Sequence, residues 1–227
     1  GTSQALFWDA SAESLGIGTT SPSELLEVSK STDGATIRIS STQNDSAHST
    51  TTPFGILEFY SSDSSGAGAG VRGSIKSFPA STTGGAADLV FSTSNSTTND
   101  VEMMRITDGG NVGIGETSPA NDNRLHVKYS DTGATPFSTS PLVVERAGVN
   151  LINILGQNAD DTGFLFGDQD DNDVGGLFYL HSSNAMTFRT NTAERMRIDS
   201  SGNVGIGTDS PSTALEVNNS SAGATVA

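Results

Sequence analysis

The stretch NVGIGTDSP at Asn203–Pro211 decides how this chain is organised. It recurs as NVGIGETSP at Asn111–Pro119 and as LGIGTTSP at Leu15–Pro22. A short Leu-x-Val segment follows each copy, at Leu26–Val28, Leu125–Val127 and Leu215–Val217. The Gly-Ile-Gly cores begin at residues 16, 113 and 205, so successive cores are 97 and 92 residues apart. A repeat of this length predicts an array of similar modules, which usually builds an elongated protein.

Each copy is preceded by a hairpin signal. Met196–Ile198 is followed by the turn Asp199–Asn203, and Met104–Ile106 by the turn Thr107–Asn111. Two short apolar segments around a five-residue turn rich in Gly, Asp and Asn predict a β-hairpin. In the first copy Leu6–Trp8 and a longer turn take this place.

The segments between the copies also correspond, as short apolar runs separated by polar loops. The predicted strands are Ile37–Ile39, Ile56–Tyr60, Val71–Phe78 and Leu89–Phe91, then Leu142–Val144, Leu151–Leu155, Phe164–Phe166, Leu177–Leu180 and Met186–Phe188. No stretch shows the 3.6-residue apolar period of a helix, so the sequence predicts an all-β protein of tandem small sheets with hairpins. The predicted divisions are 1–33 as the end of a preceding module, 34–128 and 129–218 as complete modules, and 219–227 as the start of another. The chain is therefore expected to be a segment of a longer polypeptide.

Composition narrows the classes of partner. The net charge is −15, and only 33% of the residues are hydrophobic. An acidic surface repels nucleic acid and anionic membranes, and no apolar run approaches the length of a membrane span. There is no cysteine, so disulfides and thiolate metal sites are excluded. A lean core predicts that other chains contribute to stability.

The string from Glu194 to Thr208, with Ser210-Pro211 and Leu215–Val217, resembles the repeats of tailed-bacteriophage tail fibres and related virion appendage proteins. The resemblance covers the three hairpin blocks, about a third of the chain. In that family such repeats often lie upstream of a C-terminal intramolecular chaperone. This sequence does not contain one, and the two alternatives are that it was cleaved off or that it lies beyond residue 227. The resemblance implies a parallel homotrimer of intertwined or abutting chains, with the modules of each chain stacked along a fibre axis. It also implies a location in the virion and outside the cell.

The Gly-Ile-Gly core fits a threefold axis. Its isoleucines, Ile17, Ile114 and Ile206, are predicted to point toward the axis while the glycines let backbones approach closely. The alternative is that the glycines only accommodate a bulge or sharp bend within one chain.

The sequence contains no complete nucleotide-binding or metal-binding motif. No copy of Gly-x-Gly has the third glycine of a dinucleotide site, and Gly66–Gly70 lacks the Lys-Ser/Thr of a phosphate loop. No cofactor is therefore expected. The acidic loop containing Asp168, Asp170 and Asp173 is the candidate calcium site, although it lacks the glycine and final glutamate of an EF-hand and also fits a solvated loop. The three histidines lack zinc-like spacing and are expected to be surface or strand residues.

Glycan contact requires exposed aromatic side chains beside polar groups, and the candidates are Tyr60, Tyr179 and His181. No catalytic motif occurs, so the chain is not expected to be an enzyme. The expected function is a structural segment of a phage-like tail fibre. It would join other virion tail proteins, project a receptor-binding tip and contact host surface glycans. The alternatives are a carbohydrate-active tailspike segment and a repeat of a bacterial extracellular filament or adhesin.

Overall fold

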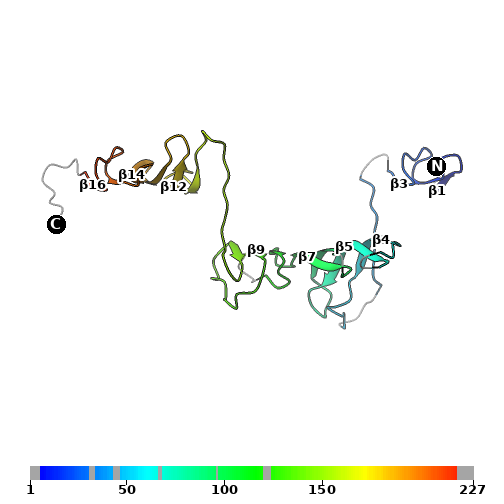
Figure 1. Cartoon of the computed structure of the whole chain (residues 1–227). Helices are drawn as coiled ribbons and strands as arrows, with labels where there is room; N and C mark the ends of the chain where they lie inside the picture. Colours follow the sequence, from blue (N-terminus) through cyan, green and yellow to red (C-terminus); the bar gives the residue numbers. More distant parts are fainter. Residues whose placement is uncertain are drawn as a thin grey trace. The chain divides into compact units, whose positions relative to one another are not determined.

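The computed structural model describes residues 6–30, 34–42, 47–65, 68–95, 97–119 and 124–218. Within these residues all regular structure is β-strand, and the strands form three sheets (Figure 1), which confirms the all-β prediction. None of the described residues lies in a helix that is long and apolar enough to cross a membrane. By its internal contacts the chain divides into two units, Gly1–Asn150 and Leu151–Ala227.

The first sheet has three strands in the order β1-β2-β3. They are β1 (Leu6–Asp9), β2 (Ser14–Ile17) and β3 (Leu26–Val28). β1 and β2 form the expected antiparallel hairpin, and β3 pairs with β2 in parallel.

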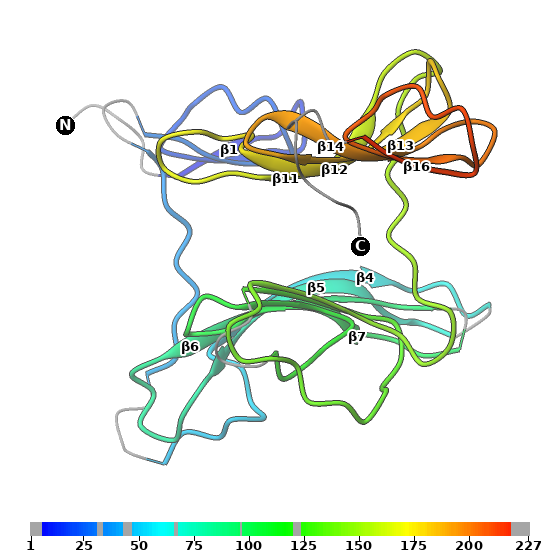
Figure 2. The same cartoon turned by 90° about the vertical axis from the view of Figure 1, so that its left-hand side faces the viewer.

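The second sheet has seven strands in the order β10-β9-β8-β7-β6-β5-β4. They are β4 (Gly55–Ser61), β5 (Gly70–Pro79), β6 (Ala87–Thr93), β7 (Val101–Ile106), β8 (Val112–Ile114), β9 (Leu125–Lys128) and β10 (Leu142–Glu145). The pairs from β4 to β8 are antiparallel, whereas β8–β9 and β9–β10 are parallel. In Figure 2 the strands β4–β7 lie in one layer and long loops extend to one side of it.

The third sheet has six strands in the order β11-β12-β13-β14-β15-β16. They are β11 (Thr162–Phe166), β12 (Gly175–Leu180), β13 (Ala185–Thr190), β14 (Ala193–Ile198), β15 (Val204–Ile206) and β16 (Leu215–Val217). Only the last pair, β15–β16, is parallel. In every sheet neighbouring strands are also neighbours in sequence.

Two predicted strands are wrong. Ile37–Ile39 and Leu151–Leu155 have no strand partner, and their apolar side chains are exposed, for example 82% at Leu151 and 84% at Leu155. An apolar run identifies a segment that favours burial, but a strand also needs backbone hydrogen bonds to a neighbouring strand. Ile39 packs against Gly55 at the start of β4 without forming a ladder, and Leu151–Leu155 has no strand pairing.

The Gly-Ile-Gly-x-x-Ser-Pro motif builds a crossover between two parallel strands. The chain leaves β2, β8 or β15, passes over the sheet and returns as β3, β9 or β16. A Cβ added at Gly16, Gly113 or Gly205 would lie 2.4, 2.1 or 2.6 Å from the carbonyl oxygen three residues later. The first glycine is therefore required by the crossing backbone of its own chain.

The second glycine of the motif turns the chain. Gly18, Gly115 and Gly207 have φ values of +80°, +69° and +71°, which side chains other than glycine adopt at a cost. A Cβ there would lie 2.1 or 2.2 Å from the carbonyl oxygen just after the Leu-x-Val strand. The bend within one chain, considered above as the alternative to close packing at an axis, thus accounts for both glycines.

A β-bulge links the hairpin to the crossover. In β7 and β14 one residue, Met103 or Arg195, is left without a partner across the ladder. Its carbonyl accepts a hydrogen bond from the second glycine of the motif, Gly115 at 2.9 Å or Gly207 at 3.0 Å. The residue before the bulge is a glutamate, and the residue two positions after the bulge is an arginine. These two side chains form an ion pair, as in β14, where Arg197 Nε lies 2.6 Å from a Glu194 carboxylate oxygen.

The face of each sheet that the loops cover is mainly polar. Apart from proline, Val90 and Ala185 are the only buried hydrophobic side chains among the described residues. The buried polar side chains are more numerous: Ser14, His48, Ser74, Asp88, Ser92, Asn111, His126, Glu145 and Thr187. Alternation along β6 and β13 places Val90 with Ser92 and Ala185 with Thr187, so the loops cover a mainly polar face of the sheet.

We expect Gly205→Ala to destabilise the third sheet by roughly 2–3 kcal/mol, because the new methyl group forces the crossover away from the strand. Gly34→Ala is the matched control, since nothing lies within 4 Å of a Cβ there. Thermal unfolding measures both. Equal midpoints for the two variants would contradict the steric account.

Thr192→Gly should stabilise the protein by about 1 kcal/mol. Asn191 and Thr192 form the two-residue turn between β13 and β14 with φ values of +51° and +57°, and a β-branched side chain is strained in that conformation. Thr192→Ala, which lacks the β-branch but keeps a Cβ, should fall between the parent and the glycine variant. Urea unfolding tests this order, and a glycine variant less stable than the parent would refute it.

Candidate functional site

The third sheet exposes one continuous apolar face. Alternation and register place on it large hydrophobic side chains from all six strands: Phe164, Phe166, Leu177, Tyr179, Met186, Phe188, Met196, Ile198, Val204, Ile206, Leu215 and Val217. These residues are called the apolar face of the third sheet. Phe166 is 64% exposed and Leu215 62%. An exposed apolar surface of this extent is unusual for a monomeric protein.

The first two sheets carry an equivalent face. In the second sheet Leu57, Ile75, Phe91, Met104, Ile114, Val127 and Val144 follow one another across the strands. In the first sheet Leu6 and Trp8 lie opposite Ile17 and Leu15, which in turn lie opposite Val28 and Leu26. Trp8 is 59% exposed. The same kind of open apolar face therefore recurs in all three sheets.

The three isoleucines of the Gly-Ile-Gly cores lie on these faces. Ile17, Ile114 and Ile206 are about equally exposed, at 39%, 42% and 41%, whereas the first glycine beside each is buried on the opposite face. The glycine therefore faces its own crossover and the isoleucine faces outward. Their position at a trimer axis stays a prediction.

The predicted glycan contacts are divided between the two units. Tyr60 lies at the end of the edge strand β4 and is 66% exposed. Tyr179 and His181 lie in the other unit, with their rings in edge-to-face contact at 4.9 Å. The His181 Nε2 is 3.3 Å from the Thr162 hydroxyl, and the Tyr179 hydroxyl donates to the Asn184 side chain at 3.3 Å. Glycan binding by either group stays a prediction.

The candidate calcium loop uses its carboxylates locally. Asp168 accepts hydrogen bonds from the backbone N–H groups of Asp170 and Asp171, at 2.9 and 3.0 Å. Asp171 accepts one from Asp173, and the nearby Asp171 carboxylate raises the pKa of Asp173. These contacts form a turn closed by side chains, and calcium binding here stays a prediction.

A different cluster contains ligand types that bind metals. Among the described residues, Glu116, His126 and Glu145 are the only three such side chains whose ligand atoms lie within 4.8 Å of one another. The His126 Nε2 is 3.0 Å from a Glu145 oxygen. The Lys128 Nζ lies 2.7 Å from Glu116 and 3.8 Å from Glu145, so an ammonium group supplies the positive charge beside both carboxylates.

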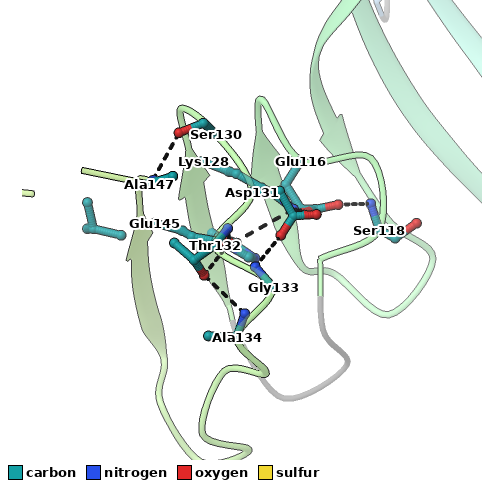
Figure 3. Close-up of polar contacts among 12 residues, drawn as sticks. Glu116, Ser118, Lys128, Ser130, Asp131, Thr132, Gly133, Ala134, Glu145 and Ala147 are labelled. Atoms are coloured by element: carbon teal, nitrogen blue, oxygen red, sulfur yellow. Dashed lines mark hydrogen bonds and ion pairs between the residues drawn. The ribbon is translucent and has the colours of Figure 1, made fainter.

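Further hydrogen bonds fix this cluster in place (Figure 3). Glu145 accepts from the backbone N–H and the hydroxyl of Thr132, at 2.7 and 2.9 Å. Glu116 accepts from the backbone N–H of Ser118 at 2.7 Å. The cluster therefore joins the crossover after β8, strand β9, the loop after it and strand β10.

The hydrogen bonds keep Glu145 ionised. The Thr132 backbone N–H, followed by the Thr132 hydroxyl, His126 and the Lys128 charge, lowers the pKa of Glu145 from 4.5 to about 2. Hydrogen bonding to Glu116 and the nearby carboxylates raises the pKa of Lys128. The arrangement is a stabilising network of charges.

The sequence interpretation missed this cluster and treated His126 as an ordinary strand residue. The sequence does contain a sign of this cluster, because the second copy of the repeat differs from the first and third at two of its positions. Glu116 stands where the others have Thr19 and Thr208, and His126 stands where they have Glu27 and Glu216. In those copies the glutamate instead accepts from a serine after the proline, as in Ser212 to Glu216 at 2.8 Å.

No protein-family model matches this sequence, and no curated protein matches it. Among solved structures, the chain is similar to the carboxy-terminal domain of the bacteriophage T5 L-shaped tail fibre. The sequence identity is 10% and the TM-score is 0.38. The match covers 82% of this chain and 91% of that chain.

Acid should weaken the network around Glu145. Because folding lowers the pKa of this carboxyl, its contribution to stability is complete above pH 4.5 and is lost as the pH falls toward 2. We expect Glu145→Gln to lower the melting midpoint at pH 7 and to approach the parent at pH 2.5. The exposed Glu58→Gln is the control. A Glu145→Gln difference that stays constant with pH would refute the prediction.

Proposed function

We propose that this chain is a structural segment of a phage-like tail fibre that assembles as a parallel homotrimer through its apolar faces. The observation that carries the proposal is the inverted distribution of side chains. Each sheet buries mainly polar groups under its loops and exposes most of its large apolar groups on the other face. Covering that face would supply the hydrophobic stabilisation that one chain lacks.

The recurrence of the face favours other copies of the same chain as its cover. A partner must present apolar surface again and again along the chain, once for each repeat. A parallel copy in the same register does this automatically, because its own repeats have the same spacing. Three copies follow from the family resemblance of the repeat blocks.

The role that we infer is mechanical rather than catalytic. A stack of self-assembled modules would project a receptor-binding tip from the virion while joining other tail proteins. The loops lie away from the apolar face and stay free in such an assembly, so they are the surface available for contact with host glycans.

Two adjacent residues test the assembly. We expect purified protein to have about three times the 23.3 kDa monomer mass in light scattering. Phe164→Asp places a charge on the apolar face and should shift the mass toward the monomer at the same concentration, because an unpaired charge would be buried in the interface. Leu165→Asp is the matched control, since Leu165 is 58% exposed on the opposite face of the same strand.

A monomeric parent protein would overturn the proposal, and a stable dimer would overturn its threefold symmetry. An equal loss of mass in both variants would show that the interface is not the apolar face.

A further inference from the structure

The apolar face of the third sheet contains a hollow at one side. It has a volume of about 680 Å³ and is lined by Phe166, Gly175, Leu177, Phe188 and residues of the adjoining loop. Gly175 lies directly opposite Phe166 in the β11–β12 ladder. Because Gly175 has no side chain, part of this hollow lies directly beside Phe166.

The two sides of this face differ in character. Along β11 and β12 the outward residues form three opposed pairs: Thr162 with Tyr179, Phe164 with Leu177, and Phe166 with Gly175. We call the side with Tyr179 the tyrosine side and the side with Gly175 the glycine side. One side therefore presents a large ring, and the other, at the same level of the sheet, presents a hollow.

Cyclic symmetry brings these two sides together. Consider copies of the sheet arranged around an axis that crosses the strands, with their apolar faces toward the axis. The tyrosine side of one copy then adjoins the glycine side of the next copy. This holds for any number of copies. Residues at the same level then meet, because rotation about the axis leaves the level unchanged.

We propose that Tyr179 of each copy packs into the hollow beside Phe166 and Gly175 of the next copy. This proposal rests on the parallel assembly inferred above and assigns its lateral contact. It also assigns Tyr179 to an interface between chains, rather than to the glycan contact that the sequence suggested.

The chemistry of the two sides supports the pairing. A tyrosine has an apolar ring that suits Phe166 and Phe188 and a hydroxyl that can stay at the polar edge of the hollow. Beyond the glycine side lies the acidic loop with Asp168, and beyond the tyrosine side lies His181, whose ring contacts Tyr179. Aromatic and polar groups therefore have complementary partners across the same contact.

Engineered cysteines can test this contact, since the natural chain has none. The test protein carries Phe166→Cys together with Tyr179→Cys. Within one chain these positions cannot form a disulfide, because Phe166 is four residues from the partner of Tyr179, or roughly 13 Å along the strand. Mild oxidation should give covalent dimers and closed rings on a gel, and a reducing agent should remove them.

The control replaces Leu165 rather than Phe166, together with Tyr179→Cys. Leu165 is as exposed as its neighbour but lies on the opposite face. We expect roughly tenfold less covalent product from this pair, because the sulfurs are held too far apart to bond. The single Tyr179→Cys variant should also give little product. Strong linking by it would overturn the proposal in favour of two tyrosine sides in contact.

Light scattering under reducing conditions separates the possible failures. An assembled double variant that gives no more product than the control overturns the hollow contact and leaves the fibre proposal intact. A parent protein that is monomeric overturns both. If the first pair disturbs folding, Thr162→Cys with Phe166→Cys repeats the test on β11 alone and keeps Tyr179 intact. Absence of linking there likewise overturns the pairing of the two sides.

Discussion

The fold depends on an imbalance in hydrophobic burial. A sheet of one layer can cover one of its faces with its own loops, and this chain uses its loops to cover the polar face. Val90 and Ala185 are then the only non-proline hydrophobic side chains buried among the described residues, whereas aromatic side chains such as Phe166 and Trp8 stay open to solvent. The driving force that ordinarily holds a domain together is thus largely unused within a single chain. Charged networks such as the one at Glu145 and Lys128 fix the loops but cannot replace it.

The repeat block is a solution to a problem of geometry. A row of antiparallel hairpins would keep reversing direction, and the crossover changes this by placing the next strand parallel to the last. The two glycines let the chain pass over its own strand, and the bulge residue supplies the carbonyl that holds the second glycine. The buried proline, Pro119 or Pro211, packs against the crossing from above. Contacts within the chain therefore explain the recurrence of the two glycines, and in the second and third copies that of the proline.

The strands and hairpins could be predicted because period-two alternation and turn residues are local signals. The turn Asp199–Asn203 and its flanking strands lie where the sequence placed them, with Asp199 accepting from Ser201 and Asn203. The failures have a common cause, which is that pairing depends on residues distant in sequence. Leu151–Leu155 has the composition of a strand without a neighbour to pair with. The cluster of Glu116, His126 and Glu145 forms only because β10 adds to β9, and no spacing rule announces that contact. The inversion of polar and apolar faces was equally hidden, because alternation says that a strand has two faces but not which one the loops will cover.

Strand order in these sheets has a consequence for how the molecule forms. Every strand pairs with its neighbour in the chain, so each ladder closes a short loop and no distant segment has to be found. Pairing between strands that are near in sequence favours fast formation of the ladders. The apolar faces of the sheets contribute little hydrophobic stabilisation unless another surface covers them. In the proposed assembly, that contact between chains would depend on protein concentration. In the assembly proposed above, strand pairing within each chain would precede contact between copies, and the exposed aromatic residues would be open to aggregation until the faces are covered.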